Sequence, residues 1–316
     1  MPDIDGGHYF LSALVPVLTE PVDCAGSGPV APSHVLRETL AMLPTAMQSR
    51  LDLSSGMVSP FSRCTRTHFV RLFVIDQPNF NGRLPSDAIV QAVRNTPLLK
   101  PQPVDRLATP WLAVIIDFDA RPDEADGGLA SYCEGLWQLM QPELAAIFSA
   151  CFGFAAVRSG ADFAAYIKRC QVETTMPFND YWTTSPPLPS LSLNQLLAGF
   201  GGVALVLGLA GYAGLRAGGV SCWWLALVVP LALGLAAWLV YRFVMARGSR
   251  PFPTAPHADL PSVLKALYLQ QRFARFAIAT QGADDIALYQ AFGAFVAAEN
   301  PGDTAAPTRL PGRIDA

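Results

Sequence analysis

The sequence predicts an α+β domain, followed by two membrane-spanning helices and a C-terminal pair of helices. Three observations predict this arrangement. Two uncharged apolar runs lie late in the chain, at 196–215 and 220–241. Before them, runs rich in β-branched and aromatic residues are interspersed with stretches of helical spacing, as in α+β domains. After them, two more helical patterns are separated by Gln281 and Gly282.

The N-terminal part begins with a predicted strand at 8–17, which ends at a stretch rich in Gly, Pro and Ala at 21–32. Ser33 is predicted to cap a helix, and Pro44 to end it. The apolar positions of this helix follow helical spacing and are Val35, Leu36, Leu40 and Leu43.

Two stronger strands follow, at 67–76 and 111–119. The first is rich in β-branched and aromatic residues, and the second is almost entirely apolar. A strand that is apolar on both faces is expected at the centre of a sheet. The connection between them, 77–110, contains several prolines and a predicted short helix at 86–94.

Between 130 and 182, predicted helices alternate with predicted extended segments. A helical pattern covers 130–152, and Pro142 predicts a kink within it. We expect a strand at 154–157, a helix at 161–169 and an extended segment at 171–182. Three prolines then form a stiff lead into the first apolar run, at Pro186, Pro187 and Pro189.

This order of strand, helix, strand, strand, helix, strand predicts the split-βαβ arrangement, so residues 1–185 are expected to form a ferredoxin-like βαββαβ domain. Its sheet would be antiparallel, with two helices on one face. The other face then needs a cover, which a second copy, the C-terminal helices or the membrane surface could supply.

The apolar runs predict a transmembrane helical hairpin within 186–250, because about 20 apolar residues span the roughly 30 Å of bilayer hydrocarbon. The alternative is a pair of buried helices in a large soluble core. Arg242, Arg247 and Arg250 follow the second run, so the positive-inside rule places both termini in the cytoplasm. Small residues within the hairpin would suit a homodimer contact. They include Ala210, Gly214 and Gly218.

Beyond the hairpin, 251–300 is expected to form a C-terminal helical hairpin. Asp259 opens a helix at 263–280 and Asp284 caps another at 286–300, while 301–316 is expected to be disordered. The net charge of −3 argues against a nucleic-acid surface. The six cysteines are scattered without a metal-binding spacing, which is typical of reduced thiols.

Two segments carry a family resemblance. THFVRLFVID (67–76) and WLAVIIDFD (111–119) resemble the ferredoxin-like domains of the dimeric α/β-barrel superfamily, which includes haem-binding proteins, monooxygenases and dye-decolorizing peroxidases. YIKRCQVETTMPFNDYW (166–182) and LPSVLKALYLQQRFARFAI (260–278) resemble uncharacterised bacterial membrane-associated proteins of this build. The GxxDG signature of the peroxidases is absent, and Asp126-Gly127 is only a fragment of it.

The histidines near strand ends are candidates for haem binding. His8 begins the first predicted strand, and His68 lies on the second, near Arg71. A histidine ligand with a nearby arginine would suit a peroxide- or oxygen-dependent enzyme, in which His68 and Arg71 would be the catalytic candidates. The alternative is that these are ordinary polar residues at strand ends.

Two polar groups are further candidates. Carboxylates after the third strand could hold Ca²⁺ or Mg²⁺, or form a solvated acidic loop. They are Asp117, Asp119, Asp123, Glu124 and Asp126. Lys168, Arg169 and Asn179 lie in a polar segment before the membrane that could bind a lipid headgroup or another anion, or could tie that segment to the sheet.

The sequence thus leaves two functions open. The first is a membrane-anchored protein of unassigned activity, whose cytoplasmic domain acts in binding or assembly. The second is a haem-dependent or cofactor-free oxidoreductase acting on an apolar substrate. The motifs of P-loop, dinucleotide-binding, GxSxG and HExxH proteins are absent.

Overall fold

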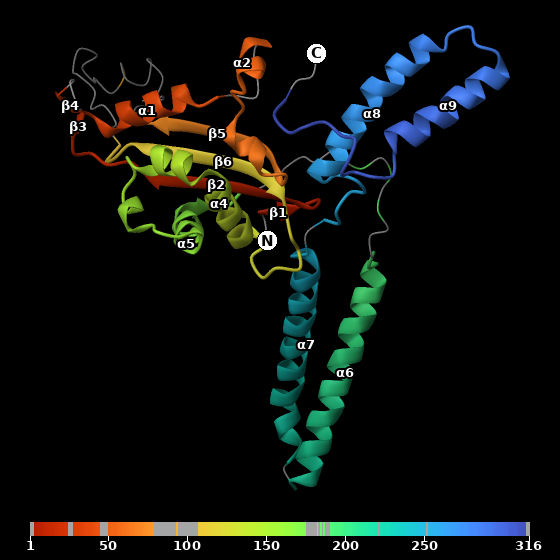
Figure 1. Ribbon diagram of the computed structural model, residues 1–316. Helices are drawn as coiled ribbons and strands as arrows, with labels where there is room; N and C mark the ends of the chain where they lie inside the picture. Colours follow the sequence, from red (N-terminus) through yellow and green to blue (C-terminus); the bar gives the residue numbers. More distant parts are fainter. Residues whose placement is uncertain are drawn as a thin grey trace. The chain divides into compact units, whose positions relative to one another are not determined.

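The computed structural model describes residues 3–24, 28–44, 50–78, 93, 107–174, 182, 184, 186, 190–219, 221–250 and 252–313 (Figure 1). The chain divides into two compact units. One contains 180–253, and the other combines 2–179 with 254–316, so the C-terminal helices belong to the same unit as the sheet. The helix expected at 86–94 lies outside the described residues, apart from Val93.

The main sheet is antiparallel throughout and has the order β1-β2-β6-β5, with β7 also paired to β2 (Figure 1). Its strands are β1 (Ile4–Asp5), β2 (His8–Pro16), β5 (Thr67–Ile75), β6 (Trp111–Asp119) and β7 (Gln171–Val172). The strand at 111–119 is central, as its apolar sequence predicts. The segment 21–32, which was expected to end the first strand, contains two short strands that pair antiparallel, β3 (Val22–Cys24) and β4 (Gly28–Val30).

One face of the sheet forms the core beneath helices α4 (Leu129–Phe148) and α5 (Gly160–Cys170). Alternate residues of β2 and β6 point into it, as expected for strands with one buried face. Tyr9, Phe118 and Tyr132 stack there, with ring centroids 4.9 and 3.8 Å apart. Burial of such side chains contributes about 1.5–3 kcal/mol each.

The long helices of this unit lie where the sequence predicts them, but some details differ. The helix α1 (Pro32–Met42) is capped at Ala31 without a side-chain bond, so the prediction of Ser33 as its cap is wrong. Helix α4 bends at Met140, close to Pro142, as predicted. Between α4 and α5, the expected strand at 154–157 is instead the 3₁₀ turn η2 (Phe154–Ala156). Its Phe154 ring packs among the aromatic side chains of α4 and α5, so the short apolar run is buried without pairing to the sheet.

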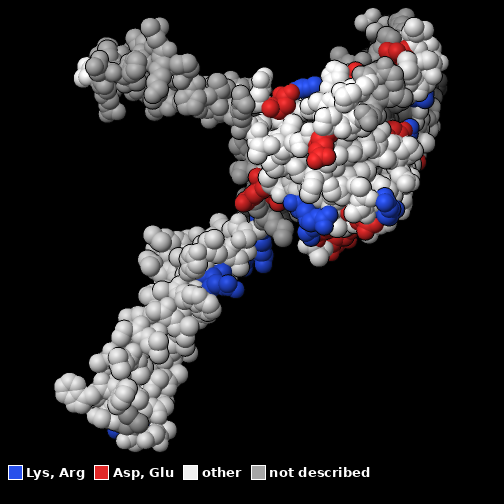
Figure 2. All heavy atoms as spheres, turned by 90° about the vertical axis from the view of Figure 1, so that its left-hand side faces the viewer, with Lys and Arg blue, Asp and Glu red and all other residues white. Residues whose placement is uncertain are grey.

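The second unit contains two helices long and apolar enough to cross a membrane, α6 (Leu193–Ala217) and α7 (Leu225–Gly248). A short 3₁₀ turn, η3 (Cys222–Trp224), precedes α7, which therefore starts later than its apolar run and continues past Tyr241. The two helices pack along each other, and Gly211 lies against Val228. Figure 2 shows this pair almost free of charged side chains along its length, with basic residues near its ends.

The C-terminal helices α8 (Leu260–Ala279) and α9 (Asp285–Glu299) begin at Asp259 and Asp284, and each of these carboxylates caps its helix as predicted. Residues 301–313, where disorder is expected, contain neither helix nor strand but contact α8. The ammonium of Lys265 donates to the main-chain carbonyls of Glu299 and Pro307. Two short helical segments complete the unit, α2 (Arg50–Ser55) and η1 (Pro60–Arg63).

Candidate functional site

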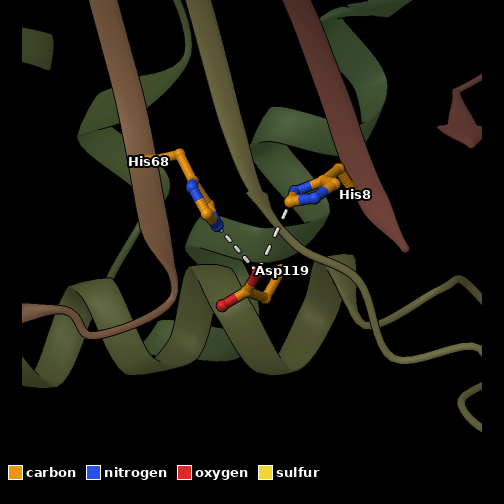
Figure 3. A group of neighbouring side chains, drawn as sticks. All are labelled: His8, His68 and Asp119. Carbon is orange, nitrogen blue, oxygen red and sulfur yellow. Dashed lines mark hydrogen bonds and ion pairs between the residues drawn. The ribbon is translucent and has the colours of Figure 1, made fainter. Parts of the chain in front are cut away.

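Two histidines and an aspartate from three adjacent strands meet at one end of the sheet (Figure 3). His68 Nε2 lies 2.8 Å from Asp119 Oδ1, and His8 Nδ1 lies 3.9 Å from the same oxygen. The potential ligand atoms of the three residues all lie within 4.8 Å of one another. The side chains are 5% (His8), 8% (His68) and 16% (Asp119) exposed, so water screens their interactions only weakly.

His8 is positioned by the turn that precedes it. Gly6 and Gly7 join β1 to β2 with positive φ angles of 57° and 88°, which suit glycine in a tight hairpin. His8 is then the first residue of β2 and pairs with Asp119, the last residue of β6. Directly opposed residues of an antiparallel pair point to the same face, so His8 and Asp119 meet across the strands.

His68 reaches this face because β5 is irregular at its start. Thr67 pairs with Phe118 and Phe69 with Asp117, so His68 is an extra residue in the ladder, as in a β-bulge. Thr67 points toward the core, where its hydroxyl lies 2.8 Å from that of Tyr132. The bulge places both His68 and Phe69 away from the core, whereas strict alternation would have grouped His68 with the inward-facing Val70.

Asp119 is held by two further contacts. The main-chain N–H of Leu260, at the start of α8, donates to Asp119 Oδ2 at 3.1 Å. The guanidinium of Arg66 donates to the main-chain carbonyl of Asp119 at 2.8 and 3.1 Å. The first turn of α8 therefore covers the cluster, and Arg66 fixes the end of β6.

The surroundings of His8 favour its neutral form. Burial lowers the pKa of His8, as does His68 beside it, while the carboxylates of Asp119 and Asp259 act in the opposite direction. Burial also raises the pKa of Asp117, which precedes Asp119 on the same face of β6, and His68 opposes that rise. A neutral imidazole next to a carboxylate is the form in which histidine binds metal ions.

Arg71 lies on the same strand as His68 but outside the cluster. Both side chains line a groove of about 760 Å³ that follows β5. The two candidates for catalysis, His68 and Arg71, therefore line the same groove. Only His68 belongs to the cluster with His8 and Asp119.

The remaining candidates are dispersed. Asp126 accepts from the N–H groups of Gly128 and Ala130 at the start of α4, and Glu124 pairs with Arg121 at 3.0 Å. Five carboxylates were candidates for a metal site, and Asp119 is the one that lies in the cluster with the histidines. Among the described residues, Asp117, Asp123, Glu124 and Asp126 are outside this cluster. Lys168 and Arg169 lie in the last turn of α5. Asn179 lies outside the described residues.

Sequence reasoning named these three residues but did not combine them. The signal was present, since His8 starts one strand, His68 lies near the start of another, and Asp119 ends the third. In an antiparallel sheet with β6 between β2 and β5, those positions share one end. The missing information was the bulge at the start of β5, which turns His68 to the face of His8 and Asp119.

Comparison with known proteins adds no relative: no family model, curated protein or solved structure matches the chain.

Proposed function

We propose that this chain is a membrane-anchored protein whose α+β domain binds a divalent transition-metal ion through His8, His68 and Asp119. The observation that carries the proposal is the convergence of three ligand atoms within 4.8 Å. Two imidazoles and one carboxylate form a donor set that suits Zn²⁺ or Fe²⁺. Three protein ligands also leave coordination positions open for water or a small molecule.

The geometry needs a modest adjustment to take an ion. Metal–ligand bonds of about 2.0–2.2 Å bring donor atoms closer together than 4.8 Å, so the His8 ring has to move toward Asp119. An ion would replace the hydrogen bond between His68 and Asp119, while Leu260 and Arg66 continue to hold Asp119. The carboxylates of Asp117 and Asp259 add negative charge nearby, and Arg66 opposes it.

A second candidate is the haem-dependent or cofactor-free oxidoreductase that acts on an apolar substrate. The groove lined by His68 and Arg71 favours it. His68 Nε2, however, already bonds to a carboxylate within a buried cluster, which suits a small ion better than a porphyrin. The absence of a Soret band after haem is added to the purified protein would remove the haem-dependent version.

Membrane anchoring is supported by α6 and α7. Roughly 37 and 36 Å of helix exceed the thickness of the hydrocarbon layer. None of the described residues of α6 is buried, and in α7 only Ala232 and Ala236 are, so their leucines and valines have no protein core to enter. The contact between Leu260 and Asp119 joins parts of the chain on either side of the helices, which supports an even number of crossings.

We also infer a ferredoxin-like core. The chain passes through β2, α1, β5, β6, the α4–α5 pair and β7, and the neighbouring strands are β7-β2-β6-β5. This order supports a split-βαβ unit, with β1 as an additional edge strand.

The metal proposal is tested by titrating the full-length chain, purified in detergent and treated with EDTA, with Co²⁺, whose visible absorption reports its ligands. We expect one ion per chain. His68→Ala and Asp119→Ala should each weaken binding by about 100-fold or more, because loss of an outer-shell partner alone costs 10–100-fold.

The matched control is His34→Ala. His34 lies on the exposed face of α1, where it pairs with Glu38 at 3.3 Å, and it is not part of the cluster. This variant should bind Co²⁺ as the unmodified chain does. If His34→Ala and His68→Ala lose the absorption equally, or if Co²⁺ produces no ligand-dependent absorption at all, the proposal is wrong.

A further inference from the structure

A groove of about 760 Å³ follows β5, the edge strand of the described sheet. Its lining includes residues 67, 68 and 70–73, and six residue steps of about 3.3 Å make its strand-side wall about 20 Å long. The opposite walls come from the end of α1, from η1 and from the start of α8. This volume is within the range of small-molecule sites, roughly 300–1,000 Å³.

The walls of the groove are chiefly apolar. Leu40 and Leu43 contribute from the α1 side, Leu72 and Phe73 from β5, and Leu264 from α8. An apolar channel of this length suits an extended hydrocarbon chain, because burial of each CH₂ group contributes about 0.8 kcal/mol.

Among the described residues that line the groove, Arg71 is the one arginine, and its side chain is exposed. Two arginines near the groove are paired with carboxylates: Arg37 with Asp76 at 2.9 Å and Arg63 with Glu143 at 2.8 Å. Among the described residues, Arg71 has no carboxylate partner within ion-pair distance. An arginine in an apolar groove complements an oxyanion, which it can bind through two parallel hydrogen bonds.

We propose that this groove binds a single-chain amphiphile with an oxyanion head, a carboxylate or a phosphate, whose head pairs with Arg71 and whose chain lies along β5. Binding does not require the metal ion, since Arg71 and the leucine walls are not among its ligands. The head would lie in the same groove as His68, which links the two sites without making one depend on the other.

The test is calorimetric titration of the full-length chain in lipid nanodiscs, with EDTA present and with empty nanodiscs as the blank. Dodecanoate and dodecyl phosphate are the two anionic probes, and the tighter of them identifies the head. We expect dodecanol, which lacks the charge, and acetate, which lacks the chain, to bind at least tenfold more weakly.

Arg71→Gln should weaken dodecanoate binding about tenfold or more, as expected for loss of a charge-assisted pair. Leu264→Glu should abolish it by placing a carboxylate on the apolar wall. Arg37→Gln, which removes a surface arginine outside the groove lining, is the matched control and should leave binding unchanged.

The proposal is overturned if neither probe binds above the blank, or if Arg71→Gln binds dodecanoate as tightly as Arg37→Gln does. Because the titration contains EDTA, neither result affects the Co²⁺ titration. Near-ultraviolet circular dichroism of each variant establishes that it is folded, so loss of binding is not attributed to unfolding.

Discussion

His8 is a base that is buried in the folded protein and exposed to water in the unfolded chain. Its pKa in the folded state lies below the ordinary value of 6.5, because of burial and of His68. Below about pH 6.5, the unfolded chain therefore binds a proton that the folded protein does not. The free energy of unfolding should fall as the pH decreases through that value, and the effect should level off below the folded-state pKa.

Thermal unfolding of the metal-free chain between about pH 7.5 and about pH 5 measures this dependence. His8→Gln should flatten the decrease, whereas His34→Gln, at an exposed position, should retain it. An equal pH dependence in His8→Gln and the unmodified chain would contradict the expectation.

The individual site residues could be predicted from sequence, but their combination could not. His8, His68 and Asp119 each stand out as polar groups at strand ends. Alternation along THFVRLFVI, however, groups His68 with Val70 on the core face. The bulge that reverses this assignment involves no glycine or proline, so nothing local in the sequence marks it. Arg71 and His68 line the same groove, and their part in catalysis stays a prediction.

The turn between β1 and β2 determines where His8 enters the sheet. Gly7 has a φ of 88°, and a β-carbon there would collide with the side chain of Thr254. Gly56 has a similar φ of 74°, but no atom lies within 4 Å of the place that a β-carbon would take. Substitution of Gly56 by alanine therefore measures the loss of stability from a positive φ alone. The same substitution at Gly7 adds the loss from a collision with Thr254.

Gly56→Ala should lower the free energy of unfolding by about 1–2 kcal/mol, the cost of a left-handed conformation. Gly7→Ala should lower it by more and should also weaken Co²⁺ binding, because His8 is displaced. Chemical denaturation and the Co²⁺ titration measure the two effects. Equal losses of stability in both variants, with Co²⁺ binding intact, would show that the contact with Thr254 does not position His8.

Strong periodicity made the long elements predictable. The three main strands, the kink near Pro142 and the caps at Asp259 and Asp284 all follow from local chemistry. Short apolar runs were not predictable in the same way. The apolar run at 154–157 is compatible with either a strand or a buried turn. Phe154 packs against Phe148 and Tyr166, and this packing favours the turn.

For the whole molecule, anchoring by α6 and α7 predicts that the full-length chain remains in the membrane pellet after alkaline carbonate washing and is released by detergent. A hairpin that crosses twice also places 3–174 and 252–313 on one side. Reporters fused to the two ends should then give the same accessibility to added protease in spheroplasts. Recovery of the chain in the carbonate supernatant, or opposite accessibility of the two ends, would contradict this topology.

The same proposed topology has a control within the chain. Reporters inserted after Gly218, between α6 and α7, should show the opposite accessibility. The charge of Arg216 there is outnumbered by Arg242, Arg247 and Arg250, so the positive-inside rule favours cytoplasmic ends.

The hydrogen bond from Leu260 to Asp119 has a consequence for the order in which the protein is made. During synthesis, His8, His68 and Asp119 are made first and the two apolar helices α6 and α7 next. Leu260, whose main-chain N–H donates to Asp119, is made only after them. A nascent chain halted after Gly248 would carry every ligand of the proposed ion with none of the α8 turn above them. If the proposed ion binds, its ligands are therefore all synthesised before α8, and loading with metal does not have to wait for that helix.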